Sequence, residues 1–295
     1  MSDVDPIVQS VAAEVAKAIW NRRQIAPISA RHPGFDLAKA YAVTAELRRL
    51  RIAHGETPLG RKIGFTNRSI WAEYGVSAPM WGDVYDSTTC DIGHKAICNL
   101  HHESEPQIEP EIVFGFAHAP SPNMDERAML GCIEWVAHGF EIVQSIFPKW
   151  KFQLADTIAA NGLHGALMIG PRHRISDRNA QQWLTALKAF EIKLYKDGTF
   201  VDRGTAMSVL DGPLSALAHL VRLLDRDPDN PQLQAGEIVT TGTLTKALPV
   251  KPGETWSTCS AKSHSTPDSE ASPSRRRGET ITPRTLRSAR PRARA

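Results

Sequence analysis

Two glutamates separated by a single residue lie in the segment PQIEPEIVFGF, residues 106–116. Side chains alternate between the two faces of a strand, so Glu109 and Glu111 are expected on the same side. Two carboxylates this close repel each other, and burial would raise their pKa values unless a cation lies between them. Oxygen ligands of this kind suit Mg²⁺ or Mn²⁺. The alternative is a solvated strand face with two surface glutamates, and the pair alone favours that alternative.

A third carboxylate, Glu141, lies further along the chain in the apolar segment GFEIVQS. An acid flanked by Phe140 and Ile142 is either exposed at a sheet edge or held by a partner. Three carboxylates on segments next to the core would leave roughly half of an octahedral coordination shell open to water or substrate. The three glutamates together therefore predict a divalent-metal site that is able to do chemistry.

Lys62, in the segment GRKIGFT, has the apolar neighbour Ile63 and then Gly64. An ammonium in this setting can bind a substrate carboxylate or stabilise an enolate oxygen, and burial would make its pKa adjustable. The residues alone favour the alternative, a surface lysine in a salt bridge.

The elements that must position these side chains are predicted from periodicity and capping residues. Residues 7–20 carry apolar side chains at helical spacing, and a second helix is expected from Asp36 as N-cap to Gly55. Further elements are expected in the following order: a strand in EIVFGF, a helix in DERAMLGCIEWVAHG, a strand in GFEIVQSIF, a helix in NAQQWLTALKAF, a hairpin in EIKLYKDGTFV, a helix from Pro213 and a strand in GEIVTTGTLT.

This mixture of elements predicts an α+β fold with a substantial curved sheet. We divide the chain into a helical N-terminal region, residues 1–57, a catalytic core, residues 58–257, and a low-complexity basic tail, residues 258–295. The tail is rich in Ser, Thr, Pro and Arg and has few large aliphatic residues. We expect it to be disordered, because it cannot bury enough apolar surface to offset its ordering entropy.

Composition excludes several classes of protein. The 295 residues are 41% hydrophobic and 23% charged, as in a globular protein in water. The sequence contains no run of about 18 uncharged apolar residues, so we expect no membrane span. The acidic N-terminus lacks the pattern of a secretory signal, which indicates the cytoplasm. The four cysteines lack C-x-x-C spacing and are expected to be reduced, buried thiols.

The net charge of +3 is unevenly distributed along the chain. Residues 258–295 hold nine basic and three acidic residues, and the remainder holds 26 basic and 29 acidic ones. The body is therefore mildly acidic, which argues against nucleic acid as a partner.

Five separated motifs resemble the 2-keto-4-pentenoate hydratase and 4-oxalocrotonate decarboxylase group of the fumarylacetoacetate hydrolase superfamily. They are LGRKIGFT, PQIEPEIVFGF, FEIVQSIFPKWKFQLADTIAAN, VLDGPLSALAHL and GEIVTTGTLTKALPVKPGE. The likeness spans roughly residues 6–256 and implies a small helical N-terminal region, a mixed β-roll or sandwich core, and a homo-oligomer. It also implies Mg²⁺ or Mn²⁺ held by Glu109, Glu111 and Glu141.

The resemblance further implies roles for other residues. Lys62 matches the active-site lysine of the group, and the segment KFQLADTIAAN contributes Lys151, Asp156 and Asn161 near the active site. Asp156 is expected either to orient a lysine or a metal-bound water, or to cap the turn that follows. His164 is expected to line the pocket as an acid or base, with a structural histidine as the alternative.

The segment TTGTLT adds Thr241, Gly242 and Thr243, whose hydroxyls and flexible backbone can hydrogen-bond a substrate carboxylate. A polar loop without a ligand explains the same residues.

Two departures from the group affect the predicted reaction. Many hydratases of the group carry an aspartate where this chain has Met80, and the decarboxylases tend to be apolar there. Relatives also continue after PVKPGE with a strand that closes the roll, whereas this chain soon enters its Ser/Arg/Pro tail. We interpret this difference as a reading-frame change or an altered terminus.

The predicted function is therefore that of a metal-dependent lyase of the cytoplasm that acts on short unsaturated 2-oxo acids. A 2-keto-4-pentenoate (2-hydroxypenta-2,4-dienoate) hydratase is the first hypothesis. A 4-oxalocrotonate (2-oxohex-3-enedioate) decarboxylase is the second, and an inactive binding or scaffold homologue is the alternative from another class.

Overall fold

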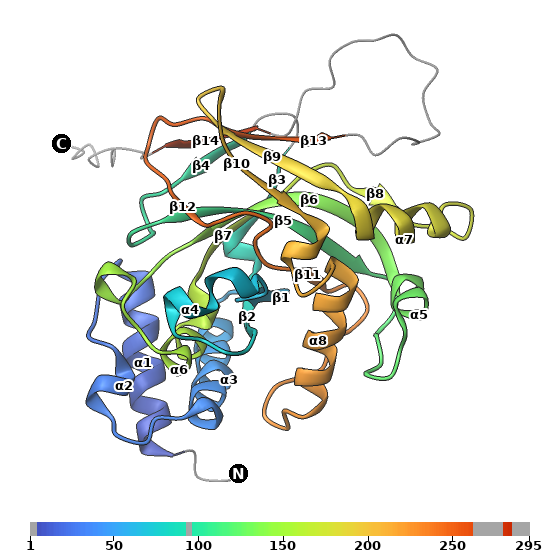
Figure 1. Ribbon diagram of the computed structural model, residues 1–295. Coiled ribbons are helices and arrows are strands. Elements are labelled where there is room, and N and C mark those ends of the chain that lie inside the picture. The colour runs from blue at the N-terminus through green and yellow to red at the C-terminus, as the bar shows by residue number, and fades with distance from the viewer. Residues whose placement is uncertain (1–4, 93–95, 262–279, 285–295) are drawn as a thin grey trace, which may run out of the picture.

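A large mixed sheet runs through the middle of the molecule (Figure 1). The structure is a computed structural model that describes residues 5–92, 96–261 and 280–284. The sheet has the strand order β2-β1-β11-β5-β6-β7-β3, with β12 paired to β5 and β8 paired to β6. Its strands are β1 (Pro58–Gly64), β2 (Met80–Tyr85), β3 (Thr89–Asp91), β5 (Gln107–Phe116), β6 (Ile133–Val143), β7 (His164–Ile169), β8 (His173–Arg174), β11 (Ile238–Thr240) and β12 (Leu248–Pro249).

A second, smaller sheet covers one face of the large one, at the top of Figure 1. It has the order β10-β9-β13-β14-β4. Its strands are β4 (Ala96–Asn99), β9 (Glu191–Lys196), β10 (Thr199–Thr205), β13 (Trp256–Ala261) and β14 (Thr280–Arg284). Buried side chains from both sheets, among them Phe140, Leu194 and Trp256, form a shared core. The turn between β9 and β10 is the predicted Asp197-Gly198 pair, and both residues have positive φ, as a two-residue hairpin of this kind requires.

Helices cover the remaining surfaces. They are α1 (Pro6–Trp20), α2 (Ile28–Arg31), α3 (Leu37–Ala53), α4 (Trp71–Tyr74), α5 (Glu126–Gly131), α6 (Leu154–Ala159), α7 (Ala180–Ala189) and α8 (Pro213–Asp225), with short 3₁₀ turns η1 (Arg68–Ile70), η2 (Asp86–Thr88), η3 (Pro148–Trp150), η4 (Asn161–Leu163) and η5 (Ala206–Ser208). The predicted N-cap of α3 is confirmed, because the Asp36 carboxylate accepts a hydrogen bond from Lys39 N at 2.9 Å.

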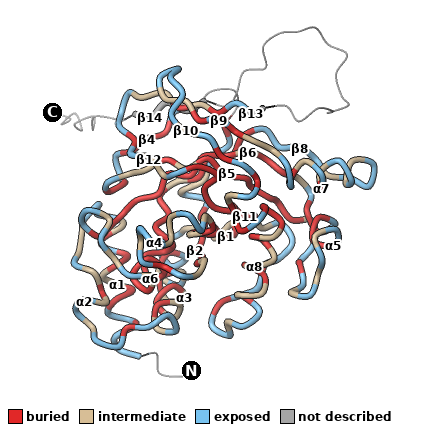
Figure 2. Tube along the Cα trace, in the orientation of Figure 1, coloured by how far each residue is buried: buried red, intermediate tan, exposed pale blue. Residues whose placement is uncertain are grey.

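The N-terminal helices share a core with a later part of the chain. Buried apolar residues of α1 and α3 pack against Ile158 and Ala159 of α6 and against Met80 of β2. The inner sides of these helices are buried and their outer sides are exposed (Figure 2). The described part of the N-terminal region, residues 5–57, therefore does not enclose a core of its own.

Among the described residues, the segment Ala206–Asp225 is long and apolar enough, by length and composition alone, to cross a membrane. The stretch is interrupted, since residues 209–212 separate η5 from α8, and Leu210, Asp211 and Gly212 among them have positive φ. More than half of the tested window is buried inside the protein, where α8 forms part of the largest apolar core. We therefore interpret α8 as a core helix.

One element prediction is wrong in its extent. The helix predicted in DERAMLGCIEWVAHG ends at Gly131, and the chain is already in β6 from Ile133. β6 lies between β5 and β7 and is largely buried, and most of its residues are apolar, with Glu134, His138 and Glu141 as the exceptions. Such a run does not show the period of two that identifies a half-exposed strand.

Two segments of the predicted tail belong to strands. Residues 258–261 end β13, which pairs with β9, and residues 280–284 form β14, which pairs with β4 and β13. These two segments are therefore strands, and the remaining residues of the predicted tail lie outside the described ones. The thiols also differ from expectation, because Cys98 and Cys132 are buried but Cys90 and Cys259 are exposed.

Candidate metal centre and active site

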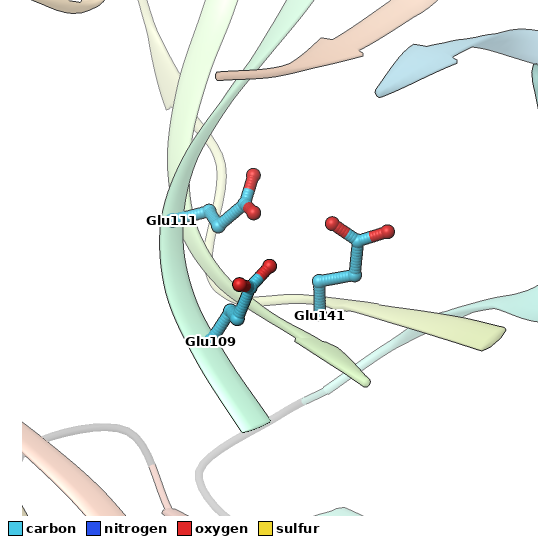
Figure 3. A group of neighbouring side chains, drawn as sticks. All are labelled: Glu109, Glu111 and Glu141. Atoms are coloured by element: carbon cyan, nitrogen blue, oxygen red, sulfur yellow. The ribbon is translucent and has the colours of Figure 1, made fainter. Parts of the chain in front are cut away.

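Three glutamate side chains meet on one face of the large sheet. β5 and β6 are antiparallel neighbours in a register that places Glu109 opposite Glu141 and Glu111 opposite Gly139. One carboxylate oxygen of each of the three glutamates lies within 4.8 Å of the others. Figure 3 shows the carboxylates of Glu109 and Glu111 leaving one strand and facing that of Glu141 from the next. The structure thus brings the predicted ligands together.

Glu111 is held by the segment that follows β11. Its Oε2 accepts hydrogen bonds from the Thr240 hydroxyl and from Gly242 N, the latter at 2.8 Å. β11 reaches this position because it pairs directly with β5. The other oxygen, Glu111 Oε1, is buried and has no hydrogen-bond partner among the described residues. A buried acceptor without a donor is costly, so this oxygen is available to a cation.

Glu141 is held between a histidine and a lysine. His164 Nδ1 donates to Glu141 Oε1 at 2.8 Å, and His164 Nε2 lies 2.9 Å from the Thr88 hydroxyl oxygen. Burial, with Lys62 nearby, lowers the pKa of His164 well below its ordinary value, so the ring is neutral. A neutral ring that donates from Nδ1 accepts at Nε2, which matches a hydroxyl partner.

Lys62 projects from β1 into the same cluster and is only 2% exposed. Its Nζ lies 3.2 Å from Glu141 Oε2 and donates to the Gly162 carbonyl oxygen at 3.1 Å. Burial disfavours the charged form, but Glu141, Glu109 and Glu111 together outweigh burial and raise the pKa of Lys62. The side chain is therefore an ammonium.

The cluster fits a divalent cation. If all four groups are ionised, three carboxylates and one ammonium carry a formal charge of −2. Burial is the main cause that raises the pKa values of all three glutamates, and their mutual repulsion adds to it at Glu109 and Glu111. A hard divalent cation would compensate this charge, and carboxylate oxygens are the ligands that Mg²⁺ and Mn²⁺ prefer.

A small cavity of about 40 Å³ opens beside the cluster. Its polar side includes Lys62, Glu109, Gly242 and Thr243. Of the three glutamates only Glu109 lines this cavity, so a cation held by the cluster would be open to it on the Glu109 side.

Comparison with known proteins now identifies the family. Residues 86–264 match the family model for the fumarylacetoacetate (FAA) hydrolase C-terminal region. The chain is 29% identical to the 2-hydroxyhexa-2,4-dienoate hydratase of Comamonas testosteroni over 255 residues, 86% of this chain and 93% of the relative. It is 30% identical to the 2-keto-4-pentenoate hydratase of Paraburkholderia phymatum over 257 residues, 87% of this chain and 94% of the relative. This chain belongs to the fumarylacetoacetate hydrolase family.

Other similar proteins of this family include decarboxylases. A 4-oxalocrotonate decarboxylase of a Pseudomonas species is 30% identical over 213 residues, 71% of this chain and 78% of the relative. The solved 4-oxalocrotonate decarboxylase from Pseudomonas putida G7, complexed with magnesium and adipate, superposes with a TM-score of 0.80 at 23% identity. That superposition covers 95% of this chain and 97% of the other. The resemblance and the fold class predicted from the motifs are confirmed.

Two of the predicted site residues, Asp156 and Asn161, form hydrogen bonds with backbone groups and do not line the cavity. The Asp156 carboxylate accepts from Gln153 N at 2.7 Å and from Ser29 N and Oγ at 2.8 and 2.7 Å. These contacts favour the capping alternative. The Asn161 side chain bonds both backbone groups of Asp83, at 2.8 and 2.9 Å, and so ties η4 to β2.

The remaining predicted residues divide between the cavity and its surroundings. Gly242 and Thr243 line the cavity, whereas the Thr241 hydroxyl is buried and donates to the Ile112 carbonyl oxygen at 3.2 Å. Lys151 is exposed and is not among the lining residues. His164 is buried behind Glu141 and contacts the carboxylate, not the cavity.

Three contributors to the site were missed from the sequence. They are the Thr240 hydroxyl, the Thr88 hydroxyl and the Gly162 carbonyl. Thr240 precedes the predicted segment Thr241–Thr243 by one residue. The alternation of side chains along β11 was the signal that could have indicated which threonine faces Glu111. Thr88 and Gly162 act across long sequence separations and gave no local signal.

Proposed function

We propose that this chain is a divalent-metal-dependent lyase that acts on short unsaturated 2-oxo acids, most simply as a hydratase of the 2-keto-4-pentenoate (2-hydroxypenta-2,4-dienoate) type. The observation that carries the proposal is the convergence of oxygens from half-buried Glu109 and buried Glu111 and Glu141 within 4.8 Å, beside the Lys62 ammonium. The names of the hydratase relatives, which the chain matches over most of its length, support the substrate class.

In this proposal Glu109, Glu111 and Glu141 hold Mg²⁺ or Mn²⁺. The bound cation would supply Lewis acidity toward the 2-oxo acid. Thr240, Gly242 and His164 fix the orientation of the ligand carboxylates. Their contribution is preorganisation, since a site whose groups are already oriented need not reorganise during reaction.

Lys62 has a separate role in the proposal. Its raised pKa keeps a proton on Nζ, and the Gly162 carbonyl fixes the direction of the ammonium. A buried ammonium of this kind stabilises negative charge that develops on a substrate oxygen. Gly242 N donates to Glu111, and the Thr243 hydroxyl donates to the Thr245 carbonyl oxygen at 2.9 Å. Thr243 lines the cavity, and we propose that its hydroxyl exchanges this bond for one to a substrate carboxylate.

The second candidate reaction is decarboxylation of 4-oxalocrotonate (2-oxohex-3-enedioate). Met80 favours it, because this apolar side chain lines the cavity where many hydratases of the group carry an aspartate. Both reactions develop negative charge on the same 2-oxo group, so the glutamates and Lys62 serve either one.

Incubation of the purified full chain with 2-hydroxypenta-2,4-dienoate and with 2-oxohex-3-enedioate tests the proposal. We expect Mg²⁺-dependent hydration of the first compound and loss of turnover after chelation. Release of CO₂ from the second compound as the main reaction would select the decarboxylase. Turnover that persists in excess chelator would contradict a metal-dependent lyase.

We also propose a cytoplasmic homo-oligomer. Phe200 and Val201 are exposed on β10, an edge strand of the small sheet, and apolar side chains at an edge support association. Light scattering during size-exclusion chromatography tests the assembly, and a monomer at micromolar concentration would contradict it.

A further inference from the structure

The cavity beside the glutamates has two chemically different sides. The polar side carries Lys62, Glu109 and Thr243. Most of the other lining residues are apolar, and we call six of them the apolar wall: Phe65, Ile70, Tyr74, Met80, Phe152 and Leu163. A small molecule whose head contacts the polar side must place the rest of its chain against the apolar wall.

The apolar wall is a packed surface that joins three separate segments of the chain. The rings of Phe65 and Tyr74 lie 5.8 Å apart, and the rings of Tyr74 and Phe152 stack at 5.8 Å with an interplanar angle of 8°. Met80 and Leu163 are 2% and 5% exposed. Interlocked rings and buried aliphatic groups leave little freedom to move aside for a hydrated ion.

No second cation faces this wall among the described residues that line the cavity. Lys62 is the only lysine or arginine that lines the cavity, and it contacts Glu141 and the Gly162 carbonyl at the polar side, where the proposed function assigns it to the 2-oxo acid head. Arg68, adjacent to the wall in sequence, is exposed and pairs with Asp211 at 2.8 Å. The other polar side chains of the lining, Thr66, Asn67 and Tyr74, are neutral. A carboxylate placed against the wall would therefore lose its hydration without gaining a charged partner.

We propose that the site takes 2-oxo acids with a single carboxylate and an uncharged hydrocarbon tail, and that it discriminates against 2-oxo diacids. This inference rests on the proposed function, because it assumes that the 2-oxo acid head lies at the polar side. Burial of an unpaired carboxylate is strongly unfavourable, whereas burial of methylene and methyl groups against the wall is favourable.

Binding of two six-carbon acids that differ only at the far end tests the proposal. These are 2-oxohexanoate, which ends in a methyl group, and 2-oxoadipate, which ends in a carboxylate. Pyruvate serves as the head group alone. Each acid is titrated calorimetrically into the full chain with saturating Mg²⁺, so that the result does not depend on which reaction the enzyme performs.

We expect 2-oxohexanoate to bind at least about 10-fold more tightly than pyruvate, from the added apolar contact. We expect 2-oxoadipate to bind at least about 100-fold more weakly than 2-oxohexanoate. Equal or tighter binding of 2-oxoadipate would overturn the inference while leaving the 2-oxo acid head site intact. If none of the three acids binds in the presence of Mg²⁺, the proposed function itself fails and the inference fails with it.

A pair of variants at Ile70, a half-buried residue of the wall, provides an independent check. Ile70→Arg supplies a cation and should narrow or reverse the preference for 2-oxohexanoate. Ile70→Gln is polar but neutral and should not recruit the second carboxylate. If both variants shift the preference equally, the missing cation is not what excludes diacids, and the inference is overturned.

Discussion

His164 contacts one of the proposed metal ligands with one ring nitrogen and a threonine hydroxyl with the other. Groups that orient a ligand in this way typically change metal affinity by about 10–100-fold when they are removed. We therefore expect His164→Ala to weaken Mn²⁺ binding within that range. His164→Gln, which keeps an N–H donor, should lose less. Calorimetric titration checks this, and Mn²⁺ affinity unchanged in both variants would remove His164 from the site.

Glu103 provides a pH-dependent prediction away from the metal centre. Burial raises the pKa of this 5% exposed carboxyl to about 7, and its Oε2 has no hydrogen-bond partner among the described residues. The folded-state pKa lies above the ordinary value of 4.5, so the neutral acid is favoured in the folded protein. Its stabilisation is complete below pH 4.5 and is lost as the pH rises through 7.

Between pH 4.5 and about pH 8 this group should lower the free energy of unfolding by up to about 3 kcal/mol. Urea unfolding of Glu103→Gln should show a correspondingly flatter pH dependence than the parent chain. Glu73→Gln, a change at an exposed position, should follow the parent. A Glu103→Gln variant with the parent's pH dependence would show that Glu103 is already ionised or relaxes on ionisation.

At the residue scale, the sequence was sufficient for the ligands but not for their supports. Alternation in a strand places Glu109 and Glu111 on one face whatever the fold. The pairing of Glu109 with Glu141 depends on the register of β5 and β6, which is a tertiary property. The contacts of Glu111 with Thr240 and of Glu141 with His164 also depend on tertiary structure, so no local sequence pattern predicted them.

At the scale of elements, the turn η4 carries the Lys62 partner in a strained conformation. Asn161, Gly162 and Leu163 all have positive φ, which is unfavourable for Asn161 and Leu163. The Asn161 side chain offsets this by bonding both backbone groups of Asp83 in β2. The close approach requires a glycine at position 82, because a Cβ there would collide with the Asn161 carbonyl and lie 2.9 Å from Gly162 N.

Gly82→Ala should therefore push η4 away from β2 and lower the free energy of unfolding by about 1–3 kcal/mol. The activity of the folded protein should also fall, beyond the loss expected from a smaller folded fraction, because the Gly162 carbonyl would move away from Lys62. Gly131→Ala is the matched control, since a methyl group added to Gly131, at the end of helix α5, would meet nothing within 4 Å. Urea unfolding and the hydratase assay measure both effects. Equal stability and activity in the two variants would contradict this role for η4.

Element types were predictable where one face is exposed and capping residues are present. Asp36 and Pro213 marked the starts of α3 and α8, and Asp197-Gly198 marked the hairpin. The start of β6 was not predictable, because its burial, with Glu134 exposed and Trp135 partly exposed, does not alternate with a period of two.

At the scale of the whole molecule, the N-terminal helices complete a core that includes α6 and Met80. We expect a chain lacking residues 1–57 to lose its cooperative thermal transition, because the apolar faces of α6 and neighbouring segments would be exposed. Calorimetry of the truncated protein measures this. A truncated chain with a sharp transition and parent-like Mg²⁺ binding would instead support the domain boundary predicted at residue 57.

Composition was least informative about the small second sheet. The basic tail composition favoured disorder from residue 258, yet β13 continues to residue 261 and β14 pairs with β4. Backbone pairing with an existing sheet edge does not require apolar side chains, so composition underestimates such strands.

Mn²⁺ titration of the parent chain, Glu111→Gln and Glu134→Gln tests the metal centre most directly. Glu111 belongs to the cluster, whereas Glu134 is exposed on the strand that carries Glu141. We expect a single site in the parent and in Glu134→Gln, and an affinity loss in Glu111→Gln above the roughly 10–100-fold range of supporting residues. Parent-like Mn²⁺ affinity in Glu111→Gln would contradict the proposed metal centre.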